Sequence, residues 1–261
     1  MLGRRAWVFL GAAVLTMAVA GVVAWPHLQR YVGSAPPRQI DQPIEATLPT
    51  GTHARVLGIA HNAGNHPATL QAAVRNHADA VEFDVITARG HLVAGRDHHP
   101  LPGLARQLFR GPSLEDAWGS ATGVALLKLD LKQSDPAFLD QVVEFLSPRA
   151  GSRSVMVSSP DRATLLLLHD RFPSVQLLYS ADNFAAVERL QSDPDLVAAV
   201  RGTSAYHGVV DATLLRWAHA HDLKVIAWTV NDGQRLAQLT RLGVDGITTA
   251  NLAVLRSLGR S

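Results

Sequence analysis

Short apolar or β-branched runs alternate with amphipathic stretches of helical length along the chain from residue 55 onward. Eight runs have the length and composition of strands, at 56–60, 80–85, 124–131, 154–158, 175–179, 205–206 (a weak one), 224–230 and 246–249. The stretches between them predict helices at 67–77, 113–121, 136–147, 161–171, 183–192, 211–221, 232–242 and 252–259. Residues 91–96 add a hairpin-like piece after the second run.

Several of these helices begin with capping signals. Ser113 precedes an acidic first turn, Asp161 follows a proline, and Asn231 and Asp232 precede another helical stretch. Eight strand and helix units in a chain of this length predict a parallel sheet closed into an α/β (β/α)8 TIM barrel. An open doubly wound sheet is the alternative. In a barrel, functional side chains collect at the C-terminal ends of the strands.

The N-terminal region departs from this alternation. Residues 6–25 form an uncharged apolar run, long enough at ~1.5 Å per residue to cross a ~30 Å hydrocarbon core as one transmembrane helix. Two arginines precede the run and predict that the body lies outside the cytoplasm. A cleaved signal peptide, with Ala18-Val19-Ala20 as the cleavage site, is the alternative. The expected division is an anchor or signal segment at 1–30, a Pro-rich linker at 31–52 and one domain at 53–261.

The charge composition changes once this N-terminal region is set aside. The whole chain has 24 Lys and Arg against 22 Asp and Glu, and a pI near 9.3. Four arginines and no acidic residue lie in 1–40, which leaves 20 basic and 22 acidic residues, a net charge of −2, in 41–261. Such a body is not expected to bind nucleic acid. The chain has no cysteine, which excludes disulfides and Cys-ligated metal centres.

Titratable residues stand at the ends of the first three predicted strands. His61 follows the first, and Glu82 and Asp84 alternate in the second, so both carboxylates face the same side. Two such carboxylates in a barrel mouth repel each other unless a divalent cation lies between them. Asp130 and Lys132 alternate in the third strand. Three carboxylates, a histidine and a lysine together suit a phosphate held by a metal ion. Each feature also has a purely structural alternative. His61 alone could be a hydrogen-bonded core residue, Glu82 and Asp84 could lie on an exposed strand face, and Asp130 and Lys132 could simply form an ion pair.

Five segments carry a resemblance to a known family. They are 58–61 (GIAH), 69–73 (TLQAA), 78–85 (ADAVEFDV), 225–232 (VIAWTVND) and 243–248 (GVDGIT). Together they resemble the glycerophosphodiester phosphodiesterases, in the wider superfamily of phospholipase-C-like barrels. The segment 127–132 (LKLDLK), with 113–118 (SLEDAW) before it, is most similar to the menorin branch, and venom-type sphingomyelinase D enzymes share a similar skeleton.

The resemblance implies a role for each residue that matches the family pattern. His61 is implied as one acid/base, and Glu82, Asp84 and Asp130 as ligands of one Mg²⁺ or Ca²⁺. Lys132 is implied to contact the phosphate, and Trp228 to line the pocket for the alcohol or headgroup. Tyr179, which ends the fifth run, is a further candidate pocket residue, with core packing as its alternative.

The sequence also departs from the family pattern. Asn62 stands where the family has a phosphate-binding arginine, so it is the candidate substrate contact there, and 67–69 (PAT) replaces a Glu-Asn-Thr step. The second histidine of the family aligns with Arg96 without gaps, and with His98 or His99 after a short slip. We favour His98 or His99, because acid/base catalysis needs a group that titrates near neutrality and arginine does not.

The expected function is that of an extracytoplasmic, metal-dependent phosphodiesterase, anchored in the membrane or secreted. It is expected to cleave glycerophosphodiesters or phospholipid headgroups with two histidines as acid and base. The lost arginine and glutamate keep open a second possibility, a surface module that binds lipid, glycan or protein without catalysis. A third is a phospholipase-D-like transferase that forms a cyclic phosphate.

Overall fold

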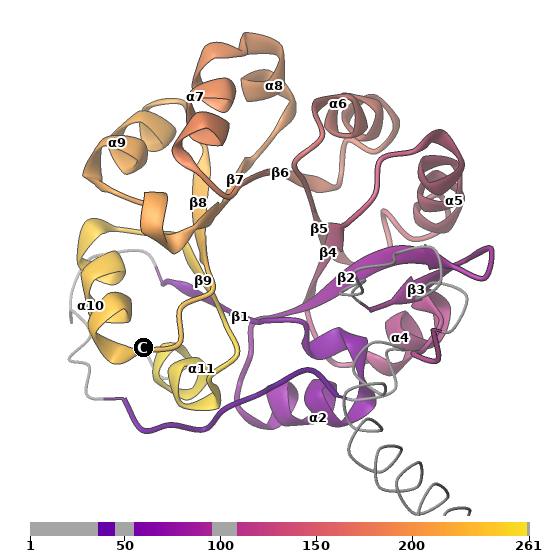
Figure 1. Ribbon diagram of the computed structural model, residues 1–261, viewed down its shortest axis with the longest axis horizontal. Helices are drawn as coiled ribbons and strands as arrows, with labels where there is room; N and C mark the ends of the chain where they lie inside the picture. The colour runs from indigo at the N-terminus through magenta and orange to yellow at the C-terminus, as the bar shows by residue number, and fades with distance from the viewer. Residues whose placement is uncertain (1–35, 45–54, 96–108, 260–261) are drawn as a thin grey trace, which may run out of the picture.

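A closed barrel is the architecture of the computed structural model, which describes residues 36–44, 55–95 and 109–259 (Figure 1). Within these residues eight strands pair in parallel, and β1 (Leu57–Ala60) pairs with both β2 (Ala80–Ala88) and β9 (Gly246–Thr249). The predicted TIM barrel is therefore confirmed. The open doubly wound alternative is wrong, because the β1–β2 pairing closes the sheet.

The remaining strands follow the chain around the barrel. They are β4 (Leu126–Leu131), β5 (Ser154–Ser159), β6 (Gln176–Ala181), β7 (Gly202–Tyr206) and β8 (Lys224–Trp228), with β3 (His91–Ala94) added antiparallel to β2. The outer ring consists of α2 (Pro67–Arg75), α4 (Leu114–Ser120), α5 (Pro136–Leu146), α6 (Arg162–Arg171), α7 (Phe184–Ser192), α8 (Pro194–Ala199), α9 (Ala212–Ala220), α10 (Gly233–Leu242) and α11 (Leu252–Leu258) (Figure 1). Two 3₁₀ turns, η1 (Ala63–Asn65) and η2 (His207–Val209), follow β1 and β7.

The strands divide their side chains between two environments. Outward-facing residues pack against the helices in one large apolar core. The lower part of the barrel interior holds a separate apolar plug, formed by Ile59, Ala80, Leu126, Met156, Leu178 and Ile226. Further along the same strands the inward positions become polar, which places the hydrophilic side chains above this plug at the C-terminal end of the barrel.

Helix starts follow the capping rules that the sequence suggested. The side chains of Ser113, Asp161 and Asp232 accept hydrogen bonds from the first-turn backbone of α4, α6 and α10. Helix α8 was not predicted, because its six residues are too few to show helical periodicity and Asp193 caps it directly after α7 ends.

Strand β7 is longer than the weak run at 205–206 predicted. Its sequence (GTSAY) lacks large apolar side chains, so the pattern underestimates it. Gly202 is needed there, since a Cβ atom at this position would lie 2.3 Å from the carbonyl oxygen of Lys224 on β8. Close contact between the two strands therefore requires the glycine.

Part of the expected linker packs on the barrel. Ile40 exchanges backbone hydrogen bonds with Ala250 and Leu252 (3.0 and 2.9 Å), and the Gln39 side chain donates to the carbonyl of Thr69 (3.2 Å). Because these partners follow β9 or begin α2 and α11, residues 36–44 lie near the barrel mouth. The expected N-terminal helix lies outside the described residues, and among those described no helix is both long and apolar enough to cross a bilayer.

Candidate active site at the barrel mouth

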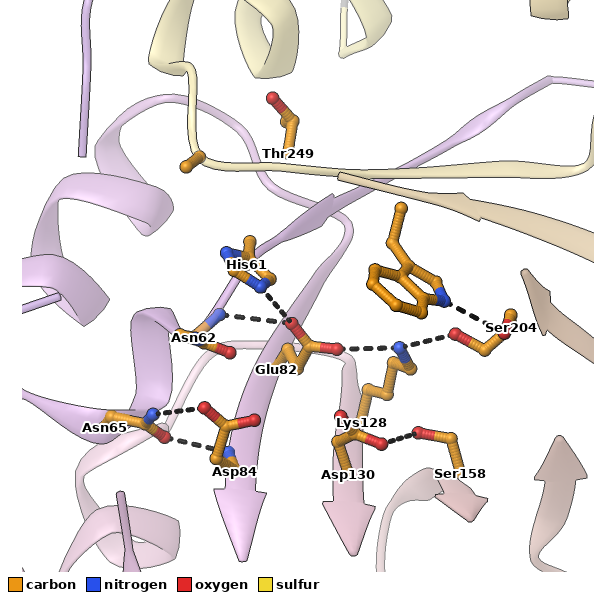
Figure 2. A network of polar contacts seen from close by, with 12 residues as sticks. His61, Asn62, Asn65, Glu82, Asp84, Lys128, Asp130, Ser158, Ser204 and Thr249 are labelled. Carbon is orange, nitrogen blue, oxygen red and sulfur yellow. Dashed lines mark hydrogen bonds and ion pairs between the residues drawn. The ribbon is translucent and has the colours of Figure 1, made fainter. Parts of the chain in front are cut away.

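The strand register brings the predicted site residues together in two layers. Glu82 on β2 is the direct neighbour of Lys128 on β4, and Asp84 is the neighbour of Asp130. Since the strands run toward the mouth, the two aspartates lie one layer closer to solvent than the Glu82–Lys128 pair. His61 follows β1 beside them (Figure 2).

Glu82 is the centre of the lower layer. Lys128 Nζ donates to its Oε1 (2.7 Å), the Asn62 backbone N–H donates to its Oε2 (3.2 Å), and His61 Nε2 lies 3.9 Å from the same Oε2 (Figure 2). Burial by itself raises the pKa of the Glu82 carboxyl. The charge of Lys128, with smaller contributions from His61 and Lys132, outweighs burial and lowers this pKa to about 2.

The upper layer contains two aspartates that share one lysine. Lys132 Nζ forms an ion pair with Asp84 Oδ1 at 2.8 Å, although the geometry is not that of a hydrogen bond. The same ammonium donates a hydrogen bond to Asp130. Asn65 Nδ2 donates to the other oxygen of Asp84 (3.1 Å), and Ser158 Oγ donates to Asp130 (2.7 Å). Burial lowers the pKa of the Lys132 ammonium, but the charges of Asp130 and Asp84 outweigh it and raise this pKa above its ordinary value.

The charges of this cluster decide whether it fits a cation. Three carboxylates and two lysines leave a net charge of −1, which repels a phosphodiester anion. As they stand, the described residues contain no group of three His, Asp or Glu side chains spaced to hold a metal. The lysines contact the carboxylate oxygens instead. The donor set nevertheless fits a hard divalent cation: Asp84 Oδ1 is buried without a hydrogen bond, and Lys132, whose side chain is 27% exposed, has room to turn away.

A cavity of about 300 Å³ opens above the cluster. His61, Glu82, Lys128, Asp130 and Lys132 form its polar wall. Its other lining residues are Leu131, Pro160, Ser180, Asp182, Ser204, Trp228 and Thr229. With a divalent cation added to this wall, the cavity, which Trp228 also lines, would suit a ligand with an anionic group and a compact neutral or cationic part.

The remaining predicted site residues do not line the cavity or lie outside the described residues. Tyr179 does not line the cavity: it is buried in the outer core, and its neighbour Ser180 lines the cavity instead. The tyrosine prediction is wrong by one step of the strand alternation. Asn62 is buried and does not line the cavity either; it contacts the site through its backbone N–H. Arg96, His98 and His99 lie outside the described residues, so the position of the second histidine stays a prediction.

Four polar residues around the cluster were missing from the predicted site. They are Asn65, Lys128, Ser158 and Ser204. Lys128 could have been found, because it continues the alternation of Asp130 and Lys132 on the same strand. Ser204 could not, since its contact with Lys128 spans 76 residues and depends on the closed barrel.

A parallel barrel with carboxylates, a histidine and lysines at its C-terminal end has the organisation of a TIM-barrel enzyme. The sequence profile of the glycerophosphoryl diester phosphodiesterase family matches residues 110–254, more than half of the chain. The chain therefore belongs to this family, whose members are phosphoric diester hydrolases. The match covers Asp130, Lys132 and Trp228 but not His61, Glu82 or Asp84. The expected similarity to the menorin branch stays a prediction.

Relatives and solved structures agree with this assignment. Glycerophosphodiester phosphodiesterase GDPD4 of Arabidopsis thaliana is 22% identical over 229 residues, covering 74% of this chain and 69% of the relative. A phosphodiesterase of Oleispira antarctica, solved in complex with the product sn-glycerol-3-phosphate, aligns with a TM-score of 0.63 and 20% identity over 80% of this chain and 98% of that one. The enzyme of Thermotoga maritima aligns with a TM-score of 0.60 and 18% identity over 80% and 99%. At these identities the structural matches show a shared fold.

Proposed function

We propose that this protein is a divalent-cation-dependent phosphodiesterase that cleaves glycerophosphodiesters or phospholipid headgroups. The observation that carries the proposal is the convergence of five side chains at the barrel mouth: Glu82, Asp84, Asp130, Lys132 and His61. All of them except Asp84 line the cavity. The product bound to the Oleispira antarctica phosphodiesterase supports a substrate of this chemical class.

Each residue has a role that its position supports. Asp84 and Asp130, with Glu82 beside them, are the candidate ligands of Mg²⁺ or Ca²⁺. When bound, the cation supplies positive charge that polarises the phosphate and brings the cluster to a net charge of +1. Lys132 would then be the contact for the phosphate, and Trp228 lines the space for the alcohol or headgroup.

Proton transfer is assigned to histidine. His61 lines the cavity with its Nε2 3.9 Å from Glu82 Oε2, so it is the candidate base or acid on one side of the phosphate. His98 or His99 is the candidate for the other side. The nucleophile is either water or a neighbouring hydroxyl of the substrate, and the second choice forms a cyclic phosphate.

The proposal is tested with purified protein and glycerophosphocholine or lysophosphatidylcholine, with the products followed by phosphorus NMR. We expect turnover that EDTA abolishes and Mg²⁺ or Ca²⁺ restores. Glu82→Ala and Asp130→Ala are expected to lose this turnover, and activity retained in both variants would contradict the assignment. Cation binding without turnover of either substrate would favour the binding module instead. A cyclic phosphate that accumulates as the end product, without hydrolysis, would identify the transferase.

We further propose that the protein acts outside the cytoplasm, anchored by the apolar run at 6–25. Segment 36–44, which lies near the mouth, supports a tether on the same side as the cavity. Two exposed aromatic residues, Phe184 at the start of α7 and Tyr206 at the end of β7, also lie at the mouth, and they favour a substrate held in a lipid surface. Extraction of membranes at alkaline pH, with an N-terminal and a C-terminal tag, tests the anchor against a cleaved signal peptide.

A further inference from the structure

One of the two lysines of the site, Lys128, lies deep inside the barrel. Lys128 is 1% exposed, and its ammonium donates to Glu82 Oε1 at 2.7 Å and to Ser204 Oγ at 3.0 Å. These partners come from β2 and β7, so the lysine crosses the barrel interior between them (Figure 2). The inward residue that precedes Lys128 on β4 is Leu126, which packs against the apolar plug. Burying a charged lysine costs free energy unless an opposite charge lies beside it. Lys128 has such a charge only while Glu82 is ionised.

The two lysines of the cluster differ in their freedom to move. The Lys132 side chain is 27% exposed at the mouth, whereas that of Lys128 is 2% exposed and is held by partners on two other strands. Lys132 can therefore leave its carboxylates when a ligand arrives, but Lys128 cannot. The charge of Lys128 is a constant feature of the cavity floor.

The position of Lys128 also determines what Glu82 can do. The lysine takes Oε1, so Oε2 is the oxygen that faces Asn62 and His61. An ammonium has three N–H donors, and among the described residues two of them have acceptors. The third is available to the cavity that Lys128 lines.

We propose that Lys128 is a positioning residue that holds Glu82 by one oxygen and sets the balance between cation and phosphate affinity at this site. The inference rests on the proposed function, because it assumes that the cluster binds a divalent cation with a phosphate. With Lys128 the cluster has a net charge of −1; without it the net charge is −2. Removing the lysine therefore strengthens attraction for a cation and weakens it for an anion.

The test measures both ligands separately from turnover. In the full-length protein, Lys128→Met keeps the length of the side chain but removes its charge. We expect the Kd for Mn²⁺, measured by titration calorimetry or electron paramagnetic resonance, to fall by at least about tenfold. With Mn²⁺ saturating, the Kd for inorganic phosphate is expected to rise by a similar factor. Damage to the fold weakens both ligands, so opposite shifts distinguish positioning from a structural role.

Two further variants complete the comparison. Lys224→Met removes the lysine at the opposite end of the barrel, whose side chain is 61% exposed, and is expected to leave both affinities unchanged. If Lys128→Met does not fold, Glu82→Gln and Glu82→Gln/Lys128→Met repeat the test, because the double variant leaves neither buried charge unpaired. The double variant is then expected to bind Mn²⁺ more tightly than Glu82→Gln.

The outcomes separate this role from the proposed function. Mn²⁺ binding by the unmodified protein, with unchanged or weaker binding after the loss of Lys128, would overturn the role of Lys128 alone. If the unmodified protein binds no Mn²⁺ at millimolar concentration, both the cation site and this role are wrong. Opposite shifts in Mn²⁺ and phosphate affinity would support both.

Discussion

Carboxylates at the two ends of the barrel are used in different ways. At the N-terminal end, Asp79 accepts from the Gly58 backbone N–H (2.8 Å) and pairs with Arg55, and Asp245 accepts from the Val225 N–H (2.8 Å) and pairs with Lys224. Each fastens the start of one strand to its neighbour, and its basic partner is exposed. At the mouth, three carboxylates face one another instead and depend on two lysines for charge balance.

This difference separates stability from function. A lone carboxylate that accepts a backbone N–H beside a solvent-exposed cation is satisfied within the fold, so it has nothing left to offer a ligand. A crowded set of carboxylates with a net charge of −1 is satisfied only in part, and a cation improves it. Substitutions at the two ends are therefore expected to change different measurements.

The largest effect is expected from the upper layer of the mouth. Asp130→Asn removes the charge that holds Lys132 and a candidate cation ligand, so kcat/KM is expected to fall by more than about 100-fold. Asp245→Asn is the matched change at the opposite end, and its kcat/KM is expected to stay within about twofold of the unmodified protein. Equal losses of kcat/KM in both variants would contradict the division between the two ends.

Stability is expected to respond in the opposite order. Asp245→Ala removes the acceptor of the Val225 N–H and the partner of His219 and Lys224. The free energy of unfolding, measured by urea denaturation, is expected to fall by about 1–3 kcal/mol. Asp130→Ala is expected to cost less, because its removal relieves repulsion with Asp84. A larger loss for Asp130→Ala would show that the mouth cluster is a structural element.

Acid is expected to lower the free energy of unfolding by protonating Glu82 in the lower layer of the mouth. The pKa of Glu82 is lowered from 4.5 to about 2, so the unfolded chain binds a proton at this residue before the folded chain does. Its contribution to stability is therefore complete above about pH 4.5 and is lost as the pH falls toward 2. Urea denaturation at pH 5 and pH 3.5, without added cation, is expected to show a smaller loss for Glu82→Gln than for the unmodified protein. An equal loss in both would contradict the Lys128–Glu82 pairing.

The smallest effect on turnover is expected from exposed apolar side chains at the two ends of the barrel. Phe184, 61% exposed, lies at the mouth, whereas Val74, 46% exposed, lies near the end of α2 on the opposite side. Phe184→Ser is expected to reduce turnover of lysophosphatidylcholine in phosphatidylcholine vesicles about threefold and to leave turnover of soluble glycerophosphocholine unchanged. Val74→Ser is expected to change neither rate. Equal rates for both variants on vesicles would show that the mouth does not contact lipid.

Much of the site could be predicted because strand alternation is a local property. Glu82 and Asp84, like Asp130 and Lys132, are two positions apart with one residue between them, and this spacing is enough to place each pair on one face. The same reasoning failed for Tyr179, because three consecutive apolar residues (177–179, LLY) do not reveal which of them face the barrel interior. The phase of β6 depends on its neighbours in the sheet.

By itself, the sequence determined the eight alternating strand and helix units, which predict a barrel, and the charged residues at the strand ends. These features depend on the nature and spacing of residues close together in the chain. The tertiary structure alone decided the partners: that Lys128 contacts Glu82 and Ser204, that Lys132 lies between two aspartates, and that segment 36–44 packs beside the mouth. Such contacts join residues distant in the chain, so they exist only after strand pairing sets the register and the barrel closes.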